Sequence, residues 1–112
     1  MKVTIMTKIK LALFIVVIAT GISLAAQTDT ATQYKRMCTL CHGADGKSDT
    51  SMGKGLKSAD LTSPAVQSQS DTQIYEVIAH GKGKMAAYEG ILGKQGVEAM
   101  VKYVRTLAPK KK

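Results

Sequence analysis

The longest apolar stretch of the chain lies near its amino terminus and is not interrupted by polar positions. Residues 11–18 are all apolar, lysines precede them, and the small residues Ala25 and Ala26 follow. A basic start, an apolar centre and small residues before a cleavage point are typical of a secretory signal peptide. The pattern predicts that residues 1–26 are a signal peptide and that residues 27–112 form the exported domain.

An uncleaved membrane anchor is the alternative interpretation of the same segment. Residues 11–28 carry no charged side chain, and about 20 apolar residues are enough to cross a bilayer. Gly21, Ser23 and Gln27 make the far end of the segment more polar, which favours cleavage. Both interpretations predict an exported protein, periplasmic in a bacterium, with a membrane link only where the segment is retained.

Beyond residue 30, apolar positions recur at helical spacing in three segments. They are Ala31, Tyr34, Cys38 and Cys41; Ile74, Val77 and Ile78; and Val97, Met100, Val101, Val104 and Leu107. The spacing predicts a helix that ends at the cysteines, a second over 71–80 and a third over about 95–107. Ser70 and Gln73 have capping-box spacing at the start of the second helix, and Gly81 can cap its end. Pro109 ends the third helix.

The segments between these helices contain few apolar residues. Residues 43–63 are rich in Gly, Ser, Lys and Asp, which predicts an irregular segment. Pro64 predicts a short helical turn, and glycines predict a loop over residues 81–88. Because no strand pattern appears, we expect an all-α fold of three to five short helices. So much loop indicates that something besides packed helices holds the domain together.

Composition points to a cofactor as that additional support. Without residues 1–26 the chain has 86 residues, four tyrosines and no tryptophan. A domain of this size has a small core and often requires disulfides or a bound metal. A large apolar cofactor would supply the missing core.

The exported part of the chain is positively charged. It carries 13 Lys and Arg residues against eight Asp and Glu, a formal net charge of +5. A positive surface suits an acidic protein partner or an anionic membrane surface. The lysines are scattered and no nucleic-acid-binding motif accompanies them, so we expect no nucleic-acid partner.

Cys38, Cys41 and His42 form a C-x-x-C-H motif, the signature of covalent haem attachment. Residues three apart share a face of a helical turn, so both thiols can form thioether bonds to one porphyrin. The adjacent imidazole then reaches the iron as its proximal ligand. The motif predicts one covalently bound haem c per chain.

Three other interpretations of the two cysteines fit less well. A thioredoxin-like motif belongs in a βαβ setting, which the surrounding pattern lacks. A zinc site normally needs four protein ligands; His80 would have to be the fourth, and adjacent Cys41 and His42 are awkward in a tetrahedral site. A disulfide between Cys38 and Cys41 would close a strained ring and leave His42 without a role.

The ligand on the other side of the iron is less strictly marked. The candidates are an open position or one of Met37, Met52, Met85, Met100 and His80. Met37 adjoins the attachment motif and cannot reach the opposite haem face, while Met100 falls in the apolar stripe of the last helix. Met85 follows two glycines whose backbone can approach the ring closely, so it is the favoured ligand. His80 is more simply a partner of the carbonyls at its helix end.

Residues 34–46, which contain the motif, resemble the start of the small bacterial class I cytochromes c. The likeness continues through residues 74–78, 81–85 and 101–107 and covers nearly all of residues 31–108. It implies the class I cytochrome c fold, with short helices wrapped around one haem. The resemblance also implies that the first and last helices cross, with Tyr103 at or near the crossing.

Carried over residue by residue, the resemblance makes Cys38 and Cys41 the thioether anchors, His42 the proximal iron ligand and Met85 the distal one. One position departs from the family pattern, which usually has Pro after the distal Met, whereas Ala86 stands here. Pro would stiffen the ligand loop. We therefore expect an iron–sulfur bond that is easier to break.

Motif and resemblance together predict a mono-haem electron carrier, and not an enzyme, that passes single electrons between periplasmic or membrane redox partners. Five loop lysines are expected near the exposed haem edge, where they could steer partners with acidic docking surfaces. They are Lys47, Lys54, Lys57, Lys82 and Lys84. The alternatives are a tethered cytochrome subunit of a larger redox enzyme and a haem-based ligand-binding protein.

Overall fold

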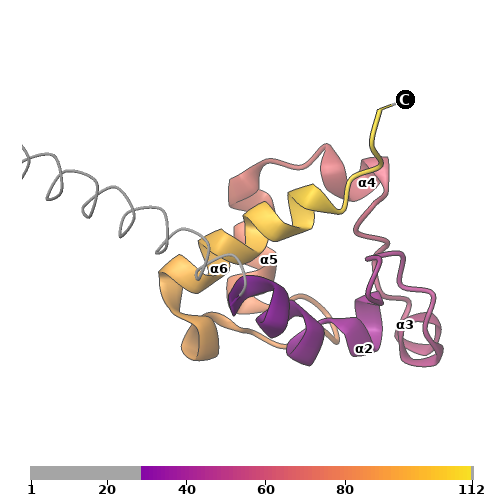
Figure 1. Ribbon diagram of the computed structural model, residues 1–112. Helices are drawn as coiled ribbons and strands as arrows, with labels where there is room; N and C mark the ends of the chain where they lie inside the picture. Colours follow the sequence, from indigo (N-terminus) through magenta and orange to yellow (C-terminus); the bar gives the residue numbers. More distant parts are fainter. Residues whose placement is uncertain (1–28, 112) are drawn as a thin grey trace, which may run out of the picture.

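The computed structural model describes residues 29–111, drawn in colour in Figure 1. These residues are helical over 29–37 and in five further elements, α2 (Thr39–His42), α3 (Ser51–Leu56), α4 (Pro64–Gln67), α5 (Asp71–His80) and α6 (Glu89–Thr106). The described chain contains no strand, and one isolated bridge joins Lys82 to Met85. The predicted all-α class is confirmed.

The predicted signal peptide, residues 1–26, lies outside the described residues. Within residues 29–111, no helix has both the length and the apolar character needed to cross a membrane.

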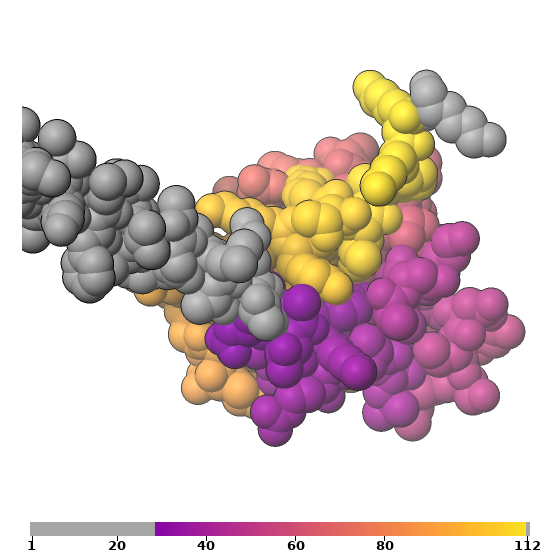
Figure 2. Space-filling model, in the orientation of Figure 1, coloured from indigo at the N-terminus to yellow at the C-terminus, as the bar shows by residue number. Residues whose placement is uncertain are grey.

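The core forms where the helix over residues 29–37 packs against α6. The rings of Tyr34 and Tyr103 lie 4.7 Å apart between their centres and are tilted by 38°. Figures 1 and 2 show the two elements side by side, the first in indigo and α6 in orange to yellow. Tyr103 therefore lies at the contact between the first and last helices, where the resemblance placed it.

Helix α5 packs against α6 and supplies the other half of the core. The buried apolar side chains of the two helices are Ile74, Ile78, Ala79, Val97, Met100, Val101 and Val104. Full burial of a side chain of this kind contributes about 1.5–3 kcal/mol relative to exposure. All of them except Ala79 are positions at which the sequence shows helical spacing, while Val77 and Leu107, which share that spacing, are only partly buried.

Local signals fix the ends of α5 as predicted. The Ser70 side chain accepts a hydrogen bond from the Gln73 N–H, and the Gln73 side chain accepts one from the Ser70 N–H. At the other end Gly81 has φ +77°, a conformation that side chains rarely adopt, and its N–H donates to the carbonyl of Val77. The sequence is sufficient to place this helix.

One predicted boundary was confirmed, and two short helical segments were missed. Helix α6 is broken at Gly93, where φ is 69° and ψ 169°, so its longer part begins close to residue 95 as predicted, and the turn from Glu89 to Gly93 was not expected. Residues 43–63 were expected to be irregular but include α3. Thr50 caps α3 by accepting a hydrogen bond from the Gly53 N–H, and two glycines within the helix hide it from a propensity argument.

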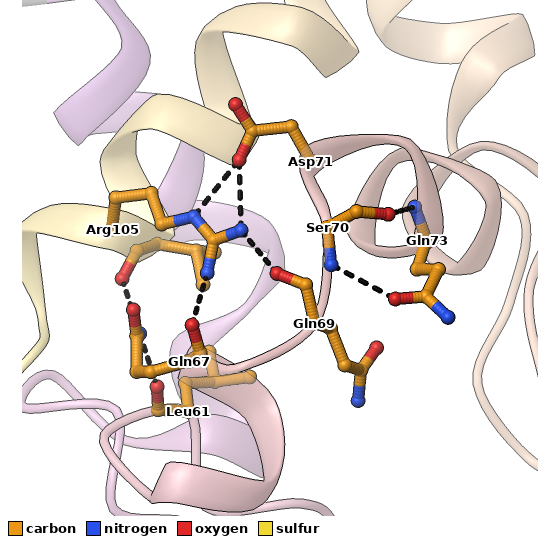
Figure 3. A network of polar contacts seen from close by, with 8 residues as sticks. Leu61, Gln67, Gln69, Ser70, Asp71, Gln73 and Arg105 are labelled. Carbon is orange, nitrogen blue, oxygen red and sulfur yellow. Dashed lines mark hydrogen bonds and ion pairs between the residues drawn. The ribbon is translucent and has the colours of Figure 1, made fainter.

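One arginine ties the segment between α4 and α5 to the last helix, as Figure 3 shows. The Arg105 guanidinium donates to the carbonyls of Gln67 and Gln69 and pairs with the Asp71 carboxylate at 2.8 Å. The Gln67 side chain donates to the carbonyls of Leu61 and Val104. A stretch with little regular structure is thereby fixed against α6.

Candidate haem-binding site

A cavity of about 450 Å³ lies between elements of the described chain that are distant in sequence. Its wall takes apolar side chains from α3, α4, α5 and α6 and from the segment between α3 and α4. They include Leu56, Leu61, Val66, Ile74, Val77, Ile78, Leu92 and Val104. This volume lies within the range of sites for cofactors and other small molecules. Helices and the loops between them therefore enclose a space beside the packed core.

Cys38, Cys41 and His42 come to this cavity together. Both cysteines are free thiols, and both line its wall with the histidine. The backbone N–H of His42 donates to the Cys38 carbonyl at 2.9 Å, which continues the helical turn that gives the two thiols a shared face. Burial, followed by the neighbouring Cys41, raises the pKa of Cys38 to about 11. Without haem attached, Cys38 is thus a neutral thiol at physiological pH.

The orientation of His42 is fixed by a backbone carbonyl. Its Nδ1 atom lies 3.0 Å from the Ala59 oxygen and 3.3 Å from the Ser48 Oγ. A carbonyl oxygen only accepts hydrogen bonds, so the proton is assigned to Nδ1. The Nε2 lone pair is then available to a metal, in the arrangement usual for metal-binding histidines.

The sequence did not reveal Ser48 or Ala59 as part of this site. Ala59 contributes only a main-chain oxygen, which leaves no mark on side-chain pattern. Ser48 lies among other small polar residues of a segment expected to be irregular. A positive φ of 57°, which a sequence cannot report, is what sets it apart.

The structure separates the candidates for the distal ligand. Met37, Met85 and Met100 line the cavity, whereas Met52 and His80 are not part of its wall. Met52 is 44% exposed on α3, and Met100 is buried in the core between the helices. Met85 is partly buried and approaches from the loop over 81–88.

His80 lies in the last turn of α5, as expected for a partner of the helix dipole. Its Nε2 lies 3.3 Å from a Glu76 oxygen and 3.8 Å from a Glu89 oxygen, so its side-chain partners are carboxylates. The cap of the helix end comes from the Gly81 N–H instead.

The loop that carries Met85 closes on itself. The N–H of Lys82 donates to the Met85 carbonyl, and the N–H of Met85 donates to the Lys82 carbonyl, at 3.2 and 3.0 Å. Gly83 allows this turn with φ +58°, and a Cβ on Gly81 would lie 2.5 Å from the Met85 oxygen. These contacts hold the loop although Ala86 stands where proline was expected. Whether the iron–sulfur bond is weaker stays a prediction.

Size and chemistry of the cavity fit a haem. It offers a largely apolar wall, two thiols for covalent attachment and an imidazole whose Nε2 is free. A thioether lines the same wall. A zinc site fits less well, because the described residues contain no group of three or more His, Cys, Asp or Glu side chains suited to a metal ion.

Comparison with known proteins agrees with this geometry. The family described as cytochrome c oxidase, cbb3-type, subunit III matches residues 25–104. The chain belongs to this family of c-type cytochromes. A solved structure, the c-type cytochrome KustC0563, is similar with a TM-score of 0.65 and 31% sequence identity, over 70% of this chain and 96% of the other. Among curated proteins no significant match is found.

As a c-type cytochrome, the protein carries covalently bound haem. Three of the five lysines expected near the haem edge, Lys57, Lys82 and Lys84, line the cavity of this cytochrome. The other two are exposed outside it, and Lys54 pairs with Asp49 at 2.7 Å. Positive charge is thus placed beside the haem-binding space and not only over the general surface.

Proposed function

We propose that this cytochrome is a mono-haem electron carrier of the bacterial periplasm. Cys38 and Cys41 form the two thioether bonds, and His42 and Met85 are the axial ligands of the iron. The observation that carries the proposal is the convergence on one apolar cavity of both thiols, an imidazole with Nδ1 bound to the Ala59 carbonyl, and a partly buried thioether.

When bound, haem supplies reversible one-electron chemistry whose potential depends on axial ligands, hydrogen bonds and burial. The chain contributes the surroundings. The Ala59 carbonyl keeps the His42 ring in one tautomer and orientation, and the turn between Lys82 and Met85 fixes the thioether loop. Apolar side chains of α5 and α6 line the cavity and limit the access of water. A thioether together with an imidazole suits an electron carrier, because this pair of ligands raises the reduction potential relative to two imidazoles.

Lysines at the cavity support partners with acidic docking surfaces. Lys57, Lys82 and Lys84 are exposed and belong to the cavity wall. Opposite charges steer encounter between proteins, and salt screens them over a Debye length of about 8 Å at physiological ionic strength. Electron transfer to an acidic partner should therefore slow as salt is added. At a fixed salt concentration, the rate of electron transfer to this partner should be lower in Lys82→Gln and in Lys84→Gln than in Lys102→Gln. Lys102 is an exposed lysine of α6 outside the cavity wall and serves as the control.

The optical spectrum tests the ligand assignment directly. Holoprotein made in a host with haem-attachment machinery should show a c-type reduced spectrum and the weak far-red sulfur-to-iron band of the oxidised form. Met85→Ala should lose that band with the haem still attached. Met52→Ala is the matched control because Met52 lies outside the cavity wall. Loss of the band in Met52→Ala instead would show that the assignment is wrong.

A subunit of a larger redox enzyme is the second candidate function. The matching family is described as subunit III of a cbb3-type cytochrome c oxidase, which favours it. Co-purification of the native protein with a membrane complex supports the subunit, whereas release with the periplasmic fraction supports the free carrier. A haem-based ligand-binding protein would bind carbon monoxide when reduced, and a Met85-ligated carrier should not.

A further inference from the structure

Ser48 adopts a backbone conformation that serine normally avoids. Its φ is +57°, and it is buried, with 7% of its surface exposed. A left-handed conformation costs a residue with a side chain roughly 1–2 kcal/mol, whereas glycine adopts it freely. Positions of this kind persist where the surrounding structure determines them, and an observed one justifies asking what the side chain does.

The Ser48 side chain lies on the hydrogen bond that orients His42. Its Oγ is 2.5 Å from the Ala59 oxygen and 3.3 Å from His42 Nδ1. Its N–H also donates to the His42 carbonyl at 2.8 Å. Because a carbonyl only accepts, the hydroxyl donates to Ala59, and this oxygen receives two hydrogen bonds, one from Ser48 and one from His42.

Two donors on one oxygen compete for its electron density. The hydroxyl fixes the direction of the Ala59 carbonyl and at the same time weakens its hold on the His42 Nδ1 proton. A stronger bond at Nδ1 makes the imidazole a more basic ligand. A more basic ligand favours the oxidised iron. Sharing the acceptor therefore favours the reduced state and raises the potential.

We propose that Ser48 is a positioning residue, which sets the direction and strength of the hydrogen bond between His42 and Ala59 and so raises the reduction potential of the haem. The inference rests on the proposed role of His42 as an iron ligand. It explains why a serine occupies a backbone conformation in which glycine would be more stable.

Three variants of the holoprotein separate the hydroxyl from the backbone. Ser48→Ala removes the hydroxyl and keeps a Cβ, Ser48→Gly removes both, and Ser48→Thr keeps the hydroxyl. We expect the same drop in potential in the Ala and Gly variants and the wild-type potential in the Thr variant. The free energies of unfolding should follow a different order from the potentials. Ser48→Gly should be more stable than Ser48→Ala, because only glycine relieves the cost of the positive φ.

Two further readouts make the test specific. In the reduced protein, the NMR signal of the His42 Nδ1 proton should move downfield in Ser48→Ala, since the bond to Ala59 becomes stronger. Ser68 is an exposed serine outside the cavity wall, so Ser68→Ala is the matched control. It should change neither the signal of the His42 Nδ1 proton nor the reduction potential. If Ser48→Thr does not fold, the Ala and Gly variants still decide the question.

Unchanged potentials, or potentials that follow stability instead of the hydroxyl, would overturn the role of Ser48. The proposed function fails in a different way. It is overturned if the wild-type protein shows no c-type reduced spectrum or if His42→Ala keeps the wild-type spectrum. Normal spectra with equal potentials contradict the Ser48 inference alone.

Discussion

The phenol of Tyr34 donates a hydrogen bond of 2.8 Å to the carbonyl of Gly43. The two residues stand on either side of the haem-attachment motif, since Tyr34 precedes Cys38 and Gly43 follows His42. The same Tyr34 ring packs on Tyr103 of α6. One buried side chain therefore connects the contact between first and last helices to the end of the segment that holds the haem.

Tyr34→Phe should lower the stability of the protein without removing the haem. The ring contact with Tyr103 remains, and the Gly43 carbonyl still accepts from the Gly46 N–H at 3.2 Å, but the buried hydrogen bond from the phenol is lost, which costs about 0.5–1.5 kcal/mol. Denaturant unfolding at pH 7 measures the change. Tyr103→Phe, which also keeps the ring pair, is the control, and an equal loss in both variants would contradict the role of the Gly43 hydrogen bond.

Stability should also fall at alkaline pH because of Tyr34. Burial above all, with smaller effects of Cys38, Tyr103 and Asp45, raises the pKa of this phenol well above its ordinary value. In the unfolded chain the Tyr34 phenol ionises at a pH of about 10, while in the folded protein it stays neutral. The contribution of this phenol to stability is therefore fully present below pH of about 10 and is lost as the pH rises further. Between pH 8 and 12, the free energy of unfolding should therefore decrease less steeply with pH in Tyr34→Phe than in the wild-type protein.

The two glycines inside α3 should respond oppositely to alanine. A Cβ on Gly53 would collide with the Cys41 carbonyl and lie 2.6 Å from the Ser48 oxygen, whereas a Cβ on Gly55 would meet nothing within 4 Å. Gly53→Ala should destabilise the protein by about 1–3 kcal/mol, the usual effect of overpacking. Gly55→Ala should stabilise it by about 0.5–1 kcal/mol through helix propensity.

Both α3 variants are read by thermal unfolding of the holoprotein and by the yield of covalent haem. The yield should fall only in Gly53→Ala, because α3 packs on the turn that holds Cys41 and His42. Equal behaviour of the two variants would show that α3 does not support this turn.

Arg105→Lys should destabilise the protein although the charge is kept. Arginine donates to two main-chain carbonyls and one carboxylate at once, a fork that a lysine ammonium cannot reproduce. We expect a loss of about 2 kcal/mol in denaturant unfolding. Lys94→Ala removes an exposed pair with Glu98 and should change stability by less than about 0.5 kcal/mol. A similar effect in both variants would mean that the network in Figure 3 contributes little.

Sequence reasoning was most reliable where the signal is local. The capping box of Ser70 and Gln73 and the end of α5 at Gly81 depend on residues within one turn of each other, and both were found where predicted. Sequence reasoning was wrong where a glycine can either belong to a helix or interrupt one. In α3 Gly53 sits inside a helix and allows close packing, whereas Gly93 breaks a helix, so residue type alone does not distinguish the two cases.

By itself the sequence determined the all-α class and the attachment motif at Cys38, Cys41 and His42, because both depend on spacing along the chain, while Met85 as the distal ligand stays a prediction. Only the tertiary structure decided that the Ala59 carbonyl orients His42, that Ser48 shares this acceptor, and that Met52 and His80 stay outside the cavity wall. The reason is physical. A main-chain oxygen and a backbone dihedral leave no side-chain pattern, and residues 17 positions apart meet only when the loop folds back.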